Sequence, residues 1–479
     1  MILILLVAAF LRFYNLSGYL QFLGDQGRDV LIVKGMIVEH QWTLLGPNAS
    51  VGGFFTGPIY YYFMLPFLWL FKLDPVGPAY LSAVFGLATV VLIYWLGREF
   101  FEKRVGILAA LLVTISPKMI EISRFSWNPN PVPFFALLTV SFLYLAVKKQ
   151  KIIYTFLTGV CVGVMVQLHY IDLIFVPILF LSILWLPLKG SRWIHILAAG
   201  GGFLLGDSLF LIFETRHGFP NSQSVWEFVT RRGQTVAPRS LNFVGLFLEM
   251  LRRLYGMLFN IRDLNLLIYP LVLGSLTAFI ARPKDKIVTK ILLVWLVVGI
   301  FGIGSYKGEL YDHYFGYLYP LPFLFTALGF DYLLSKKWLV PIFVLGFSTL
   351  IYFSVKGWFI WQPPHNMLDQ VKEIDKTILD FSQNKPFNLG LISSYNSDYS
   401  YRYFLELWDK APVTIENPQN DPERKTVTSQ LMVICENKKC EPLGNSRWEI
   451  AGFGRAEIVN ETLGPAGIRI FKLIHYKGK

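Results

Sequence analysis

Long apolar runs separated by short polar connectors dominate the sequence. The runs that can form helices lie at residues 1–14, 78–97, 105–120, 132–147, 153–168, 171–186, 193–213, 265–281, 291–305, 315–333 and 338–356. Several are shorter than the ~20 residues that cross the hydrocarbon core of a bilayer, so their ends are set loosely. The pattern predicts an α-helical polytopic membrane protein with about 11 transmembrane helices.

The charges of the connectors predict the orientation of these helices. Basic connectors at residues 98–104, 148–151, 189–192, 282–290 and 336–337 fall on one side of the membrane. The aromatic run at 56–71 would break this alternation if it spanned, so we interpret it as interfacial or re-entrant. Because short basic loops stay in the cytoplasm, the other loops and the C-terminal part are predicted to lie outside the plasma (inner) membrane.

The pattern changes after residue 356. Residues 366–381 carry apolar positions at helical spacing, whereas 387–392 and 431–434 read as strands. These signals are typical of a small α/β domain. We therefore predict a transmembrane domain at 1–356, with outer-surface helices at about 25–77, and an extracytoplasmic domain at 357–479.

Composition supports a membrane protein. The chain is 54% hydrophobic and 16% charged, and its mean hydropathy is +0.47. Its net charge of +12 falls largely in the short connectors, so a nucleic-acid partner is not expected. The first apolar run lacks a basic n-region and a cleavage site and is interpreted as a retained helix.

Two of the three cysteines form a candidate pair. Cys435 and Cys440 are separated by four residues and could close a hairpin disulfide in an oxidising compartment, or remain free thiols in a reducing one. A metal site would need further ligands, which the neighbouring sequence does not offer. Cys161 lies within an apolar run and is interpreted as a packing residue.

A pair of acids follows the first apolar run. Asp25 and Asp29 lie at positions i and i+4, so they share one face of a helix, and Arg28 lies beside them. A carboxylate at the outer membrane surface could act as a general base, and Arg28 could bind an anionic head group or tune the acids. The alternative is structural: Asp25 caps the helix and Asp29 pairs with Arg28.

The second outer loop and the end of the next helix offer polar candidates. Arg124, Trp127, Asn128 and Asn130 are interspersed with prolines, which fix the backbone, and the asparagine amides can bind sugar hydroxyls. A rigid connector with Arg124 reaching toward lipid head groups is the alternative. His169 and Tyr170 could line the same cavity or be structural.

The later outer loops contain further cations. Arg216 and His217 are candidates for phosphate binding, because guanidinium matches phosphate oxygens, although Arg216 could instead pair with Glu214. His313 is another candidate, or it belongs to an aromatic belt. Arg231, Arg232, Lys307 and Asp312 are additional charged residues on this side. The sequence has no Walker-type loop, dinucleotide fingerprint or zincin motif, so nucleotide-dependent chemistry is not expected.

This arrangement resembles the GT-C membrane glycosyltransferases, in particular the protein O-mannosyltransferase and lipid A aminoarabinose transferase-like branch. The resemblance covers roughly residues 1–356. It rests on the acid after the first helix, the surface helices, the 98–104 connector and the aromatic and proline-rich run at 314–322. It implies transfer of a monosaccharide from a polyprenyl-phosphate carrier to an acceptor protein, lipid or envelope glycan on the outer face.

The resemblance also implies roles for single residues. Asp25 would be the general base with Asp29 as its helper, although the family often has Asp-Glu where this chain has Asp25-Gln26. Asn128 and Asn130 replace a second acid that can bind a metal, so no cofactor is expected to be required, and a divalent metal is the alternative. Thr56-Gly57-Pro58 replaces a Lys-Pro pair that contacts the carrier phosphate.

Phosphate binding would then shift to Arg28, Arg124 and Arg216. The leaving group is already activated, so ATP is not needed.

Two other functions fit parts of the sequence. A transporter or flippase of lipid-linked sugars would also have outward polar cavities, and Gly200-Gly201-Gly202 with Asp207 inside an apolar run favours it. An assembly protein whose C-terminal domain binds partners is the third. Membrane lipids are expected partners of all three.

Overall fold

The computed structural model describes residues 1–49, 52–231, 242–281, 285–306 and 308–478. The chain divides into two compact units, which are described separately. The membrane unit comprises Met1–Tyr14, Gln41–Phe67 and Gly77–Pro363, and the α/β unit comprises Asn15–His40, Leu68–Val76 and Pro364–Lys479. The α/β unit therefore contains a segment from the N-terminal part of the chain.

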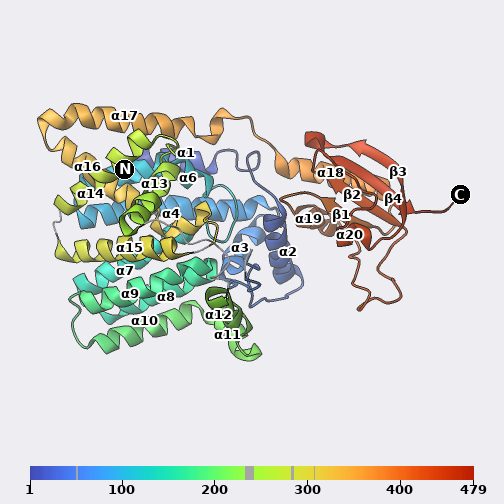
Figure 1. Cartoon of the computed structure of the whole chain (residues 1–479), viewed down its shortest axis with the longest axis horizontal. Helices are drawn as coiled ribbons and strands as arrows, with labels where there is room; N and C mark the ends of the chain where they lie inside the picture. The colour runs from blue at the N-terminus through green and yellow to red at the C-terminus, as the bar shows by residue number, and fades with distance from the viewer. Residues whose placement is uncertain (50–51, 232–241, 282–284, 307, 479) are drawn as a thin grey trace. The chain divides into compact units, whose positions relative to one another are not determined.

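The membrane unit is helical throughout its described elements (Figure 1). In chain order these are α1 (Ile2–Phe13), α3 (Ile59–Leu70), α4 (Val76–Phe100), α5 (Lys103–Ile115), α6 (Pro117–Glu121), α7 (Val132–Lys149), α8 (Ile152–Leu168), η1 (Tyr170–Ile174), α9 (Phe175–Trp185), α10 (Arg192–Gly206), α11 (Ser208–His217), α12 (Pro220–Arg231), α13 (Phe243–Leu258), α14 (Asn265–Ala281), α15 (Lys286–Ser305), η3 (Asp312–Leu318), α16 (Pro320–Leu334), η4 (Lys337–Leu339), α17 (Val340–Lys356) and η5 (Phe359–Trp361).

Every apolar run predicted from the sequence falls on helix, which confirms an α-helical membrane protein. Within the described residues, four helical segments are long and apolar enough to span alone: α4, α7, α15 and Lys337–Lys356. Helices α10 and α11 pass the same test together but bend by 79° at their junction. Helix α3 has 12 residues, fewer than a span requires. The predicted total of about 11 spans stays a prediction.

Glycines bring α8 and α10 together. A Cβ on Gly202 would overlap the carbonyl oxygen of Phe156, and one on Gly159 would overlap that of Ala199. Small residues spaced four apart let two helix backbones approach closely inside a membrane. The glycines at 159 and 202 are therefore explained by helix packing.

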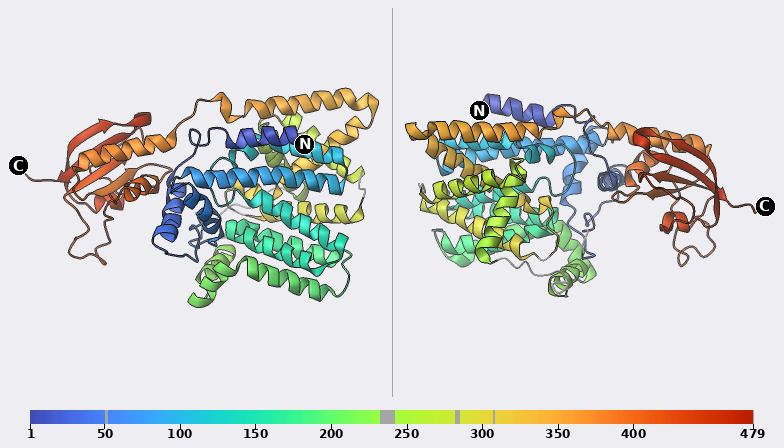
Figure 2. Two further views of the ribbon diagram at one scale, coloured as in Figure 1. Left: turned by 180° about the vertical axis from the view of Figure 1, so that it is seen from behind. Right: turned by 45° about the horizontal axis from the view of Figure 1, so that its top comes forward.

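The α/β unit is built on one four-stranded sheet (Figure 2). The strand order is β1-β2-β4-β3; β1 and β2 are parallel, and the other pairs are antiparallel. Helix α18 packs against β2 and β4. The elements are α2 (Gly24–Val38), α18 (Met367–Ser382), β1 (Asn388–Ile392), α19 (Tyr399–Leu407), β2 (Gln430–Cys435), α20 (Trp448–Ala451), β3 (Ala456–Leu463), η6 (Pro465–Gly467) and β4 (Arg469–His475).

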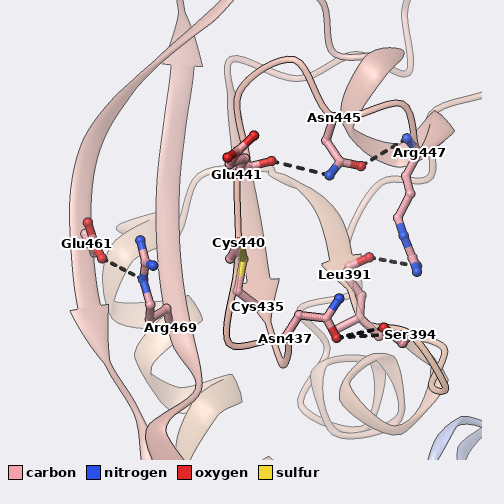
Figure 3. The surroundings of a disulfide bond; sticks show 10 residues. All are labelled: Leu391, Ser394, Cys435, Asn437, Cys440, Glu441, Asn445, Arg447, Glu461 and Arg469. Atoms are coloured by element: carbon pink, nitrogen blue, oxygen red, sulfur yellow. Dashed lines mark hydrogen bonds and ion pairs between the residues drawn. A yellow bond between two sulfur atoms is a disulfide. The ribbon is translucent and has the colours of Figure 1, made fainter.

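The sheet has an apolar core that includes Leu431 and Val433 from β2 and Phe471 and Leu473 from β4. Cys435 ends β2 and forms a disulfide with Cys440, their Cα atoms 6.0 Å apart (Figure 3). The predicted α/β domain and hairpin disulfide are confirmed. Cys161 is buried, as expected of a packing residue.

Candidate functional site

The predicted acids lie in the first two turns of α2. The helix begins after Leu23, whose backbone N–H donates to Gln26 Oε1 at 3.0 Å. The side chain of Gln26 therefore caps the N-terminus of the helix. Asp25 does not cap the helix, but its charge lies in the first turn, where the helix dipole favours an anion.

Arg28 bridges both acids. Its Nη1 lies 2.9 Å from Asp25 Oδ1, and its Nη2 lies 2.8 Å from Asp29 Oδ1. The Asp29 side chain is 1% exposed, whereas that of Asp25 is 54% exposed. The Arg28–Asp29 pair weighed as the structural alternative is thus present. It leaves Asp25 as the more exposed of the two acids.

Helix α2 is attached to α19 and to the loop before it. The backbone N–H of Gly24 donates to Asn396 Oδ1 at 2.8 Å. A Cβ on Gly27 would overlap the backbone nitrogen of Ser400, so the two backbones touch at this point. Farther along, Lys34 Nζ lies 3.7 Å from Glu406 Oε2. The acids are therefore carried by a helix that is fixed at both its start and its middle.

A second group of predicted residues meets in the membrane unit. We call Trp127, His169, Tyr170, His313 and Tyr314 the histidine–tyrosine cluster. The His313 ring centroid is 4.5 Å from that of Trp127 and 5.2 Å from that of His169. Tyr170 Oη donates to Tyr314 Oη at 2.9 Å. Trp127, His169, Tyr170 and His313, which the sequence offered as substrate-binding candidates, thus contact one another, and Tyr314 joins them.

A charged group adjoins this cluster. Asp312 Oδ2 lies 2.5 Å from Arg262 Nη2 and 3.8 Å from Lys118 Nζ. Burial and the nearby Lys118 cation lower the pKa of His313 to about 4, so the imidazole is neutral at pH 7. A neutral ring can accept or donate a hydrogen bond without adding charge.

A cavity of about 340 Å³ opens beside Asp312. Its charged lining consists of Arg252, Arg253, Arg262, Asp263 and Asp312. Glu249 pairs with Arg252 at 2.7 Å and with Arg253 at 3.2 Å. The arginines of this lining, and Lys118, were not among the candidates from the sequence. Arginines in a loop expected outside the membrane were the available signal.

The polar residues of the second outer loop bond within the protein. Buried Arg124 donates to the carbonyl oxygens of Leu11 and Tyr14 at 3.0 and 2.8 Å. Asn128 Nδ2 donates to the Leu168 carbonyl at 2.6 Å, and Asn130 Nδ2 to that of Phe125 at 2.8 Å. These bonds tie the loop to its surroundings.

Arg216 and His217 lie exposed at the end of α11. Glu214 does not pair with Arg216: its carboxylate is buried and accepts hydrogen bonds from Asn221 and Ser222 at the start of α12. The structure therefore brings neither Arg216 nor His217 into the cluster by a described contact. The side chains of Arg231, Arg232 and Lys307 lie outside the described residues.

Among the described residues, no three His, Cys, Asp or Glu side chains gather as a metal site would require. Whether the reaction needs a metal therefore stays a prediction from the sequence.

Residues 56–209, less than half of the chain, match the family model of dolichyl-phosphate-mannose-protein mannosyltransferases. None of the curated proteins matches the sequence significantly.

Solved structures share the fold at low sequence identity. One is ArnT from Cupriavidus metallidurans bound to undecaprenyl phosphate, with 13% identity and a TM-score of 0.63, covering 98% of this chain and 97% of ArnT. Apo ArnT gives a TM-score of 0.65 at 12% identity, with the same coverage. The archaeal oligosaccharyltransferase AglB from Archaeoglobus fulgidus, in complex with an inhibitory peptide and a dolichol-phosphate, gives 0.56 at 15% identity, covering 90% of this chain and 68% of AglB.

The family match, the apolar helices and the shared fold confirm the resemblance expected from the sequence: this multi-pass membrane protein has the GT-C fold of membrane glycosyltransferases.

Proposed function

We propose that the protein transfers a monosaccharide from a polyprenyl-phosphate carrier to an acceptor on the outer face of the plasma (inner) membrane. The observation that carries this proposal is the fold shared over nearly the whole length of both chains with ArnT, whose structure holds undecaprenyl phosphate. The match to a family of mannosyltransferases that use a dolichyl-phosphate carrier supports the same reaction class.

Asp25 is the general base of this proposal. It is the more exposed of the two acids, and Arg28 holds it in one orientation. The carboxylate accepts the proton of an acceptor hydroxyl or amine while that group attacks the anomeric carbon and the carrier phosphate leaves. Asp29 acts as a helper, because it fixes Arg28 from the buried side.

Within the membrane unit, the candidates for binding a phosphate are the cations beside the histidine–tyrosine cluster. Lys118 and Arg262 share Asp312, and three arginines line the adjoining cavity. Such cations stabilise the negative charge of a bound phosphate. The cluster itself offers ring faces and hydroxyls of the kind that bind sugars. These cations take the place of Arg124 as phosphate-binding candidates, because the guanidinium of Arg124 is buried and donates to the backbone carbonyls of Leu11 and Tyr14.

No metal is required in this proposal, because the phosphate linked to the sugar is already an activated leaving group. Activity that survives EDTA would support this statement, and activity restored only by added Mg²⁺ or Mn²⁺ would contradict it. The acceptor class remains protein, lipid or envelope glycan, and the domain boundary is proposed at residue 356.

The test is transfer of radiolabelled sugar from a panel of polyprenyl-phosphate monosaccharides to a cell-envelope extract. Purified wild type is compared with Asp25→Asn, which keeps the size of the side chain. We expect the variant to lose transfer by a factor of about 10² to 10⁴ and to retain carrier binding. Equal transfer by both proteins would remove Asp25 from the mechanism.

A transporter gains little from the structure. Of the three glycines that favoured it, Gly202 is explained by its close backbone contact between α10 and α8. Its remaining support is the 79° bend between α10 and α11 at Asp207. Movement of labelled carrier across the membrane of protein-containing vesicles, without transfer of the sugar, would support the transporter instead.

A further inference from the structure

The N-terminus of α2 is held by a side chain from the C-terminal part of the sequence. The Gly24 N–H donates to Asn396 Oδ1, which also accepts from the Ser397 N–H at 2.9 Å. Gly24 immediately precedes Asp25. The position of the proposed base is therefore tied to one asparagine, 372 residues away along the chain.

Asn396 is in turn fixed by Glu436. Its Nδ2 donates to Glu436 Oε1 at 2.7 Å, and Tyr401 Oη donates to the same oxygen at 2.8 Å. The donation by Nδ2 determines which end of the amide faces Gly24, so Glu436 keeps the Asn396 oxygen turned toward α2. A charged acceptor makes both bonds stronger than neutral ones.

The disulfide loop holds Glu436 in place. Glu436 follows Cys435 directly and lies inside the loop that the Cys435–Cys440 bond closes. The neighbouring Asn437 accepts hydrogen bonds from Ser394 through its Oδ1, at 3.1 Å from the backbone nitrogen and 3.2 Å from Oγ (Figure 3). The disulfide loop thus bonds to Ser394 through Asn437 and to Asn396 through Glu436, and so fixes the segment that contacts Gly24.

We infer that Asn396 and Glu436 are positioning residues for the sugar transfer, which orient Asp25 through the backbone of Gly24. This inference rests on the proposed function, since it assigns the C-terminal domain the role of holding the base. No other bond of the described residues joins a side chain to the first N–H of α2. Removal of either residue should loosen the first turn of the helix and leave the sheet intact.

The experiment measures steady-state transfer by full-length variants. We expect Asn396→Ala to lower kcat about tenfold, since small misplacements of a catalytic group are costly. KM for the carrier-linked sugar should change by less than about twofold, because the carrier site uses other residues. Glu436→Ala should behave like Asn396→Ala, whereas Glu436→Gln, which keeps an oxygen acceptor, should retain most activity.

A double variant separates positioning from general stability. If Asn396 acts through Asp25, Asn396→Ala should lower the residual rate of Asp25→Asn no further. Hydrogen exchange of residues 22–30 should increase in Asn396→Ala, while exchange in β2 and β4 stays unchanged. Asn445→Ala is the matched control, because Asn445 bonds Glu441 and Arg447 on the other side of the disulfide loop (Figure 3).

The outcomes distinguish two failures. Full activity of Asp25→Asn would overturn the proposed base and, with it, this inference. Inactive Asp25→Asn together with fully active Asn396→Ala, or a loss that adds to that of Asp25→Asn, would overturn the inference alone.

Discussion

At the scale of single residues, Arg28 determines how the two acids differ. Asp29 is nearly inaccessible and relies on this guanidinium, whereas Asp25 is largely exposed. One cation therefore neutralises a buried carboxylate and aligns an exposed one. Mutation can separate these two roles of Arg28. Loss of the bond to Asp29 should lower stability, whereas loss of the bond to Asp25 should lower the rate of transfer.

We expect Arg28→Gln to lower the free energy of unfolding by about 3 kcal/mol, because Asp29 stays buried without its cation. The measurement is the midpoint of thermal unfolding in detergent. Arg469→Gln is the control: it breaks an exposed pair with Glu461 and should cost less than about 1 kcal/mol. Equal shifts in the two variants would contradict a special role of Arg28.

The depressed pKa of His313 predicts a pH dependence of stability. The folded protein binds this proton with a pKa of about 4, below the value of an unfolded histidine. Between these two pKa values the unfolded chain binds more protons, so stability rises with pH and is lost as pH falls toward 4.

The midpoint temperature of thermal unfolding of wild type should therefore decrease as the pH is lowered from 6.5 to 4. His313→Phe, which keeps a ring against Trp127 but cannot titrate, should weaken this dependence. Parallel curves for the two proteins would show that His313 does not contribute.

At the scale of elements, α8 and α10 offer a sharp comparison within one helix. A Cβ on Gly202 meets the backbone of α8, whereas one on Gly200 meets nothing within 4 Å. We expect Gly202→Ala to destabilise the protein by more than about 2 kcal/mol through forced separation of the helices. Gly200→Ala should be neutral or stabilising by up to about 1 kcal/mol. Thermal midpoints measure both, and similar behaviour would refute close packing at Gly202.

Elements were predictable where the signal is local. The apolar runs became helices, and α18, β1 and β2 lie where the pattern predicted them. Strands β3 and β4 were not predicted. Most side chains of the edge strand β3 are exposed, so no alternation of buried and exposed residues marks it in the sequence.

The candidate site was predictable only in part, for the same reason. Asp25, Arg28 and Asp29 are close in sequence, and their shared helix face was correctly expected. The partner of that helix was not, because no local pattern links Gly24 with Asn396. The cation group at Lys118, Arg252 and Arg262 was also missed, since pairing with Asp312 and Glu249 is a property of the fold.

At the scale of the whole molecule, the orientation of the chain in the membrane is a direct prediction. The Cys435–Cys440 disulfide fits an oxidising compartment, which agrees with a C-terminal domain outside the cytoplasm. Alkaline phosphatase fused after residue 479 should be active, and the same enzyme fused at residues 148–151 should be inactive. The opposite pattern would place the acids in the cytoplasm and exclude the proposed reaction at the outer face.

The composition of the α/β unit, with α2 from the beginning of the chain and β2 and α19 from its end, has a consequence for biosynthesis. A ribosome releases Asp25 early and Glu436 only after more than 400 further residues. Until then, helix α2 of the nascent protein carries Asp25 without the contact to Asn396. We therefore expect sugar transfer to stay slow until residues 396–436 have been synthesised, so that shorter nascent chains in the membrane consume little of the lipid-linked donor.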